Sequence, residues 1–310
     1  MWAAVALLLA AGMLELRGRL DPPLEHAFVT LSSTSTPFTV HAVTDAAGRF
    51  RLKDLAPGSY TLAVLAPGRG EVRRTVHLRA NAADARGRVE MVVPFHPPPA
   101  TASEGQTVTV ESLRIPDRAL REYHRAQEKL ARRDVEGAVV HLKRAIELAP
   151  RFAAAWNQLG TIAYQTGRRE EAEKYFREAL RGEPGAYTPL LNLGGVLLNL
   201  GKYQEALDLN LRAVRDQPED ALARIQLGVN YWALGYPDKA VEQLREAKRL
   251  DPEHFSQPEL LLAQIYLERG DRSAAAAELE EFLARRPSSP DAAQVREQLR
   301  RLRAEKPAGK

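Results

Sequence analysis

The stretch WNQLGTIAYQTGRREEAEKYFREAL, residues 156–180, contains two runs of helical periodicity separated by a glycine. Ala172 and Phe176 are four residues apart in the second run, so they lie on one face of a helix. Gly167 is well suited to the reversal between the runs, because glycine adopts backbone conformations that end helices. The stretch therefore predicts two antiparallel helices, with Gly160 allowing the second helix to approach the first closely.

The same pattern recurs along the second half of the chain at a fixed interval. Pro150, Pro184, Pro218 and Pro252 are each 34 residues apart. A helix pair of this length cannot bury its apolar face alone and must stack on neighbouring pairs. The period and the recurring residues resemble the tetratricopeptide repeat family over residues 117–288. The resemblance implies an α-α superhelical solenoid of about five repeats.

Two departures from the repeat pattern carry their own predictions. Asn210 stands where Phe176 and Leu244 stand in neighbouring repeats, which predicts a more loosely packed helix pair. Residues 289–310 follow the last repeat with an apolar stripe and charges elsewhere, which predicts a capping helix and a tail.

Residues 13–96 have the alternation of half-buried strands rather than the period of helices. In the segment TDAAGRF, Asp45 is expected to close an Asx turn and Gly48 to adopt positive φ. The segment resembles the carboxypeptidase regulatory-like family, whose members are transthyretin-like β-sandwiches. The residues that carry the resemblance are Gly18, Ala27, Val29, Thr44, Asp45, Gly48, Phe50, Leu55, Pro57, Gly58 and Tyr60.

The expected architecture is therefore multidomain, all-β followed by all-α. A small antiparallel β-sandwich over 13–96 precedes a proline-rich linker over 97–116 and the repeats. By analogy with tyrosine corners, the Tyr60 hydroxyl is expected to bond to backbone near its turn. The segment TVTVESLRIP, residues 107–116, could add one strand to the sandwich or pack on the first helix.

Residues 1–12 form an apolar run too short for a bilayer span of about 20 residues. A secretory signal is the preferred interpretation, with small residues Ala10 and Gly12 before a mature start at Met13, although a positive charge before the apolar run is missing. A buried strand or a short membrane anchor is the alternative. The chain is expected to be exported, periplasmic or extracellular, without a stable transmembrane helix in its mature part; cytoplasmic or membrane-anchored placement stays open.

Composition argues against several classes of function. The 44 basic and 40 acidic residues are interleaved and give a net charge of only +4, so no nucleic-acid partner is expected. The chain has no cysteine and none of the common phosphate-binding, metalloprotease or nucleophile motifs. His26, His41 and His77 lack ligand-like spacing, so solvated strand positions are preferred over a metal site. No enzyme activity, cofactor or metal is predicted.

The repeat resemblance implies that the first helix of each pair lines a concave groove. The groove positions are Tyr123, Gln127, Asn157, Thr161, Tyr164, Leu191, Leu198, Asn199, Ile225, Val229, Trp232, Leu260, Gln264 and Leu267. They are largely apolar with amide and phenol groups, and they lack the clustered basic residues that some family members use for an acidic terminus. An apolar helix or an extended segment of a protein or peptide partner is the expected occupant. The alternative is that the apolar members are packed against neighbouring helices.

The leading functional hypothesis is a non-catalytic protein–protein interaction scaffold of the cell envelope. A second hypothesis is a carbohydrate- or cell-wall-binding protein that uses the sandwich, with the repeats assembling subunits; a homo-oligomer is one such assembly. A third is an accessory subunit of an enzyme. The sequence does not identify the partner.

Overall fold

The computed structural model describes residues 13–67, 69–96 and 115–304. The signal-like segment 1–12 and the possible strand within 107–114 lie outside these residues. The chain divides into two compact units, Met1–Val196 and Leu197–Lys310.

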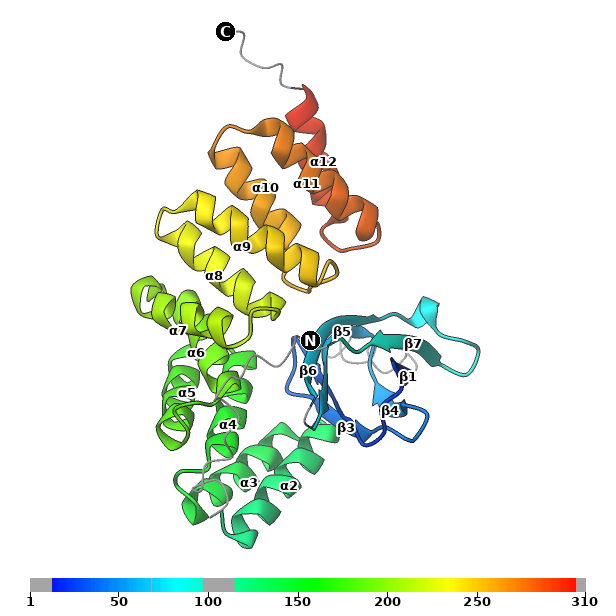
Figure 1. Ribbon diagram of the computed structural model, residues 1–310, viewed down its shortest axis with the longest axis vertical. Helices are drawn as coiled ribbons and strands as arrows, with labels where there is room; N and C mark the ends of the chain where they lie inside the picture. The colour runs from blue at the N-terminus through cyan, green and yellow to red at the C-terminus, as the bar shows by residue number, and fades with distance from the viewer. Residues whose placement is uncertain (1–12, 68, 97–114, 305–310) are drawn as a thin grey trace, which may run out of the picture. The chain divides into compact units, whose positions relative to one another are not determined.

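The first unit begins with two β-sheets packed as a sandwich. One sheet has the strand order β4-β1-β7 and the other β3-β2-β5-β6 (Figure 1). The strands are β1 (Leu14–Asp21), β2 (Phe28–Ser33), β3 (Thr39–Val43), β4 (Arg49–Leu55), β5 (Gly58–Ala66), β6 (Gly70–Leu78) and β7 (Arg88–Pro94), with the short helix η1 (Ala80–Ala82) before β7. Alternate residues of β1 and β5 are buried, as the sequence period predicts.

One strand pairing differs from the expected all-antiparallel sandwich. β1 pairs with β4 antiparallel but with β7 parallel, from Glu15 opposite Arg88 to Asp21 opposite Pro94. The chain leaves the first sheet after β4, forms β5 and β6 in the second sheet, and then returns. This crossover lets β7 run beside β1 in the same direction, because parallel neighbours need a long connection.

Two aspartates close equivalent turns in the sandwich. Asp45 Oδ1 accepts the backbone N–H groups of Ala47 and Arg49, each at 2.9 Å. Gly48 has φ +70°. The Asx turn predicted at Asp45 and the positive φ predicted at Gly48 are therefore both confirmed. Asp84 accepts two backbone N–H groups in the same way, from residues two and four positions further on. Each carboxylate therefore accepts hydrogen bonds from backbone N–H groups of the turn that do not pair with a neighbouring strand.

The predicted tyrosine corner is also present. The Tyr60 hydroxyl donates to the Ala56 carbonyl oxygen at 2.7 Å. The ring lies in the core with its centroid 6.3 Å from that of Phe38. Burial raises the pKa of Tyr60, so the phenol keeps the proton that it donates. The corner fixes the β4–β5 turn to the sandwich core.

The remaining elements of the first unit are helices that alternate along the repeats. They are α2 (Asp117–Ala131), α3 (Val135–Leu148), α4 (Ala153–Gln165), α5 (Arg169–Gly182) and most of α6 (Tyr187–Asn199). Gly160 lies against the ring of Phe176: a Cβ there would stand 2.5 Å from Phe176 Cε1. The close approach predicted for Gly160 is thus confirmed, and the missing side chain is what permits it.

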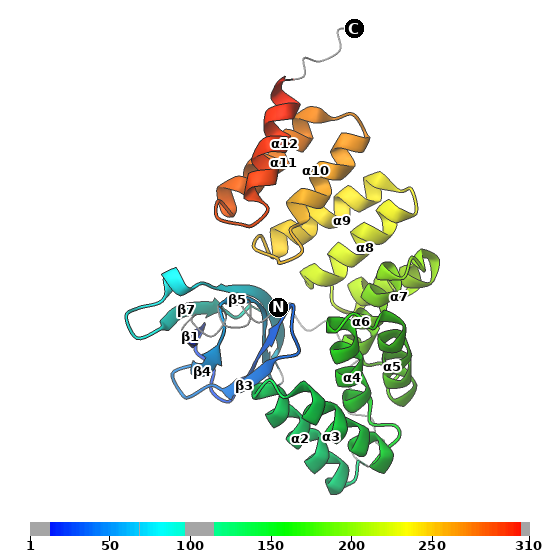
Figure 2. The same ribbon diagram turned by 180° about the vertical axis from the view of Figure 1, so that it is seen from behind.

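The second unit continues the alternation to a final helix. It contains α7 (Tyr203–Asp216), α8 (Ala221–Ala233), α9 (Pro237–Leu250), α10 (Pro258–Glu268), α11 (Arg272–Arg285) and α12 (Ala292–Ala304), the last packing on α11 (Figure 2). Val295 and Leu299 of α12 are buried against Leu279 and Phe282 of α11. The C-terminal helix therefore covers the apolar face that the last repeat would otherwise expose.

The sandwich contacts the helices of its own unit through polar groups. Gln165 Nε2 donates to the Ser33 carbonyl oxygen at 3.1 Å, and an Arg133 N–H donates to the Asp54 carbonyl oxygen at 3.1 Å. The Arg133 guanidinium also lies 4.8 Å from the ring centre of Phe38. These contacts join β-strand termini to the ends of α2 and α4.

Candidate functional site

The predicted groove positions lie on α2, α4, α6, α8 and α10, the first helix of each pair. We call those that are at least partly exposed the first-helix surface. In the first unit they are Tyr123, Gln127, Asn157, Thr161 and Tyr164; in the second they are Leu198, Asn199, Val229, Trp232, Leu260, Gln264 and Leu267.

Two of the predicted positions are not accessible. Leu191 is 2% exposed and Ile225 is 4% exposed. Ile225 belongs to the apolar cluster that α8, α9 and α10 form together. Both side chains therefore serve the packing of the repeats, the alternative that helical periodicity leaves open for any apolar position. They are not part of the first-helix surface.

In the first unit, the polar members of this surface are largely held by neighbours. Asn157 Oδ1 accepts from Asn192 Nδ2 at 3.1 Å, and Thr161 Oγ1 donates to the Asn157 carbonyl oxygen at 3.1 Å. The Nε2 atom of His41, in the sandwich, lies 3.4 Å from the Oε1 atom of Gln127. Tyr164 is the most open, at 40% exposure. This half of the surface is held by internal hydrogen bonds and lies partly against the sandwich.

In the second unit, the surface includes a hollow of about 350 Å³ beside Leu260 and Gln264. The other lining residues are Gln257, Leu279, Asp291, Gln294, Val295 and Gln298. Amide side chains offer both donors and acceptors, which suits the backbone of an extended segment. Gln257 Nε2 donates to Asp291 Oδ2 at 3.3 Å and so holds one wall of the hollow.

Trp232 marks the other end of the second unit's surface. Its indole N–H donates to Glu268 Oε2 at 2.8 Å, which links α8 to α10. The bond orients the partly exposed ring. An indole held in this way presents apolar area without losing further rotamer freedom when a partner binds.

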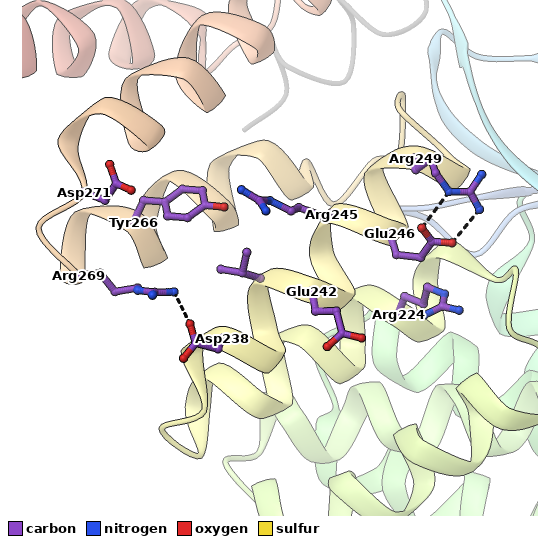
Figure 3. A pocket seen from close by; sticks show the side chains of 10 residues that line it. Arg224, Asp238, Glu242, Arg245, Glu246, Arg249, Tyr266, Arg269 and Asp271 are labelled. Carbon is purple, nitrogen blue, oxygen red and sulfur yellow. Dashed lines mark hydrogen bonds and ion pairs between the residues drawn. The ribbon is translucent and has the colours of Figure 1, made fainter.

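A second, larger hollow lies in the same unit between α8, α9 and α10, and none of its lining residues was predicted from the sequence. It measures about 860 Å³ and is lined by Arg224, Asp238, Val241, Glu242, Arg245, Glu246, Arg249, Tyr266, Arg269 and Asp271 (Figure 3). We call it the charged hollow.

Part of the charge in this hollow is paired. Arg249 donates twice to Glu246, at 2.7 and 2.8 Å, and this bond lowers the pKa of the Glu246 carboxyl against the opposing effect of burial. Arg269 bridges to Asp238 at 2.8 Å. Asp271 Oδ1 accepts from Ala274 N–H at the start of α11.

The sequence signal for this hollow was weak. Its acidic and basic residues alternate along α9 as they do on any solvated helix face. Tyr266 stands where two earlier repeats carry Ala163 and Leu197, although the repeat directly before it also has a tyrosine, Tyr231, at this station. A buried phenol places a hydroxyl inside the packing, where it needs a partner.

Comparison with protein families agrees with the two resemblances seen in the sequence. The carboxypeptidase regulatory-like domain model matches residues 17–92. The tetratricopeptide repeat model matches residues 123–187, 159–221, 191–255 and 260–299, together more than half of the chain.

Known proteins that resemble the chain are also repeat proteins. Anaphase-promoting complex subunit 3 of Schizosaccharomyces pombe is 27% identical over 45% of this chain and 21% of its own length. A Hsp70-Hsp90 organising protein of Plasmodium falciparum is 28% identical over 32% of this chain and 39% of its own. The chain thus spans well under half the length of these relatives.

A solved structure extends the agreement to the fold. MamA from Desulfovibrio magneticus RS-1 superposes with a TM-score of 0.52 at 24% identity, over 57% of this chain and 99% of that one. The helices described above are therefore arranged as in known tetratricopeptide repeats. The chain belongs to the tetratricopeptide repeat family and carries an N-terminal carboxypeptidase regulatory-like β-sandwich.

Proposed function

We propose that the protein is a non-catalytic scaffold that binds a protein or peptide partner on its first-helix surface. The observation that carries the proposal is the amide-lined hollow of the second unit, which includes the predicted positions Leu260 and Gln264. Its size, about 350 Å³, suits one or two side chains with their backbone rather than a large cofactor.

The relatives give the proposal further support. One is named as a subunit of a complex and another as an organiser of two other proteins. Both names refer to an association with other proteins. Among the described residues, no group of histidine, cysteine or carboxylate side chains could hold a metal ion.

Gln264 provides a sharp test, because it is exposed and lines the hollow. Gln264→Arg is expected to abolish capture of at least one protein that the wild-type chain retains from a cell-envelope extract, since the bulky cation fills the hollow. The matched control is Gln204→Arg, an equally exposed glutamine on α7.

Quantitative mass spectrometry of the captured proteins decides between the outcomes. A protein retained by the wild type and the Gln204→Arg variant, and lost with Gln264→Arg, would identify the partner. Equal retention by all three chains would move binding away from the first-helix surface.

We propose further that the protein works in the cell envelope. The apolar residues 1–12, followed by a module that resembles accessory domains of exported proteins, support this placement. In the described part of the chain, no helix is long and apolar enough to cross a membrane. Intact-mass measurement of protein from the envelope fraction is expected to give a chain that starts at Met13; a chain recovered only from the cytoplasm would contradict export.

A further inference from the structure

The charged hollow contains groups that its internal bonds leave unsatisfied. Beyond the Arg249–Glu246 and Arg269–Asp238 pairs, Arg245 has no carboxylate partner in the described part of the chain. Arg224 donates to the Pro218 carbonyl and to Gln243, and its charge also helps to lower the pKa of Glu246. The positive charge of Arg245 is therefore available to a ligand.

Tyr266 is the most unusual group in the hollow. Its side chain is 5% exposed, and its buried hydroxyl has no hydrogen-bond partner among the described residues. A buried hydroxyl without a partner carries the full cost of its desolvation, so such groups are rare unless something else binds them. Tyr266 lines the 860 Å³ hollow, and its hydroxyl oxygen is covered by the side chains around it, so a ligand reaches the hydroxyl when those side chains move aside.

Arg245 stands opposite this hydroxyl. The Arg245 guanidinium carbon lies 5.8 Å from the centre of the Tyr266 ring, and the two side chains point toward each other across the space between α9 and α10 (Figure 3). A phenol O–H and a guanidinium both donate hydrogen bonds, and a carboxylate has enough lone pairs to accept from both at once. The pair thus matches an anionic oxygen ligand.

The charges of the hollow favour a single negative charge over two. Its lining holds four arginines and four carboxylates, so the site as a whole is neutral. Glu242 has no hydrogen bond or ion pair in the part of the chain that the structure describes, and it lies one helical turn before Arg245. A phosphate dianion would be repelled by this carboxylate more strongly than a carboxylate monoanion.

We propose that the charged hollow binds a carboxylate group, held by the Tyr266 hydroxyl and the Arg245 guanidinium. The group can belong to an acidic residue of a partner protein or to a small organic acid. The site is separate from the amide-lined hollow of the first-helix surface and does not depend on the function proposed for it.

Two variants of the full-length chain test the two donors. Tyr266→Phe removes only the hydroxyl, and Arg245→Gln removes the charge while keeping a polar side chain. The matched controls are Tyr236→Phe, an exposed tyrosine at the start of α9, and Arg300→Gln, an exposed arginine on α12.

The ligands are chosen to distinguish a charged from a neutral group, a carboxylate from a phosphate, and a peptide from a small organic acid. They are the blocked peptide acetyl-Gly-Glu-Gly-amide, its Gln counterpart, acetate and inorganic phosphate. Binding is followed by nuclear magnetic resonance titration, using the backbone amides of α9 and α10. We expect saturable binding of the Glu peptide that weakens about tenfold or more in each test variant, because each loses one charge-assisted hydrogen bond. Both controls should bind as the wild type does.

Each result is informative. A Glu peptide that binds more tightly than acetate identifies a partner segment as the source, and equal affinity identifies a small acid. Equal binding of the Gln peptide, tighter binding of phosphate, absence of any saturable binding, or unchanged affinity in both variants would overturn the proposal.

Stability gives an independent check on the premise. Tyr266→Phe removes an unsatisfied buried hydroxyl, so the ligand-free variant should unfold at the same temperature as the wild type or at a higher one. A clear decrease would mean that the hydroxyl has a partner in the free protein, and the site would then have no unsatisfied donor to offer.

Discussion

At the scale of single residues, the absence of a side chain can matter as much as its presence. Phe176 is 1% exposed, so its ring is enclosed on all sides and cannot move to admit a new atom beside Gly160. The helix pair α4–α5 can pack at this distance only with glycine at position 160. The same logic applies to Gly228, where a Cβ would stand 2.8 Å from Leu244 Cγ.

Gly160→Ala is therefore expected to destabilise the chain. Overpacking a core typically costs about 1–3 kcal/mol, while alanine gains up to about 1 kcal/mol in helix propensity, so the net loss should be about 1 kcal/mol. The measurement is the midpoint of thermal unfolding by circular dichroism, which should fall by about 2–4 °C.

The control for this substitution is Gly185→Ala. A Cβ at that position meets nothing within 4 Å, and the backbone is not in the positive-φ region. Its midpoint should stay the same or rise slightly, since alanine restricts the unfolded chain. An equal decrease in both variants would mean that contact with Phe176 is not the cause.

At the scale of elements, one helix pair replaces apolar packing by a hydrogen bond. Asn210 and Asn230 are both fully buried, and Asn210 Nδ2 donates to Asn230 Oδ1 at 3.0 Å. Asn230 Nδ2 in turn donates to the Tyr203 carbonyl oxygen at 2.8 Å. Position 230 is Ile162 in an earlier repeat, so α7 and α8 have exchanged two apolar residues for two amides.

Asn210→Leu alone should destabilise the second unit, because it leaves the side-chain oxygen Oδ1 of Asn230 buried without a donor. The expected cost is about 1–3 kcal/mol. The double variant Asn210→Leu, Asn230→Ile should recover most of the lost stability, since both positions then carry the apolar residues found at the equivalent positions of other repeats. Urea unfolding of the two single variants and the double variant gives the coupling free energy. Additive losses would show that the two amides do not act as a pair.

This pair also illustrates how far the sequence could predict the fold. The 34-residue period predicted the helices, and the asparagine at position 210 predicted a more loosely packed pair, whereas the structure buries Asn210 fully and bonds it to Asn230. Its partner was not predicted, because residue 230 lies on the next helix and only the stacking of α7 on α8 brings the amides together. The parallel pairing of β1 with β7 was missed for the same reason, since alternation gives the faces of a strand but not its neighbours.

For the candidate site, the sequence predicted which helix carries each residue but did not predict whether its side chain is exposed. It placed Leu191 and Leu260 on first helices by the same rule, yet Leu191 is buried and Leu260 borders a hollow. Burial depends on the side chains of adjacent repeats, which the period does not specify. The charged hollow was missed because arginines and carboxylates that alternate along a helix are the usual pattern of a solvated face.

At the scale of the whole molecule, the two compact units have separate sources of stability. The sandwich rests on one apolar cluster that includes Leu16, Val29 and Leu62. The C-terminal repeats are stabilised by two other apolar clusters and by a buried ion pair. In this pair, a guanidinium nitrogen of Arg286 lies 3.0 Å from Glu259 Oε1. In repeat proteins, each pair is stabilised mainly by its neighbours.

Glu259→Ala should therefore open the second unit selectively. Removal of one partner leaves Arg286 buried without its counter-charge, which typically costs about 3–5 kcal/mol. Hydrogen exchange read by mass spectrometry should show faster exchange in peptides from α10 to α12 and unchanged exchange in β1 to β7. As a control, Glu280→Ala removes one partner of an exposed ion pair with Arg303 and should change neither region. Faster exchange throughout the chain would mean that the units unfold together.

The place of β1 in its sheet has a consequence for synthesis on the ribosome. Among the described strands β1 is made first, yet it is the middle strand of the order β4-β1-β7, and its parallel neighbour ends only at Pro94. One edge of β1 must therefore stay unpaired until the ribosome has made β7. Helix pairs of the repeats can fold soon after each emerges, because their contacts are local in sequence. The nascent sandwich is thus the part of this protein most in need of protection from aggregation.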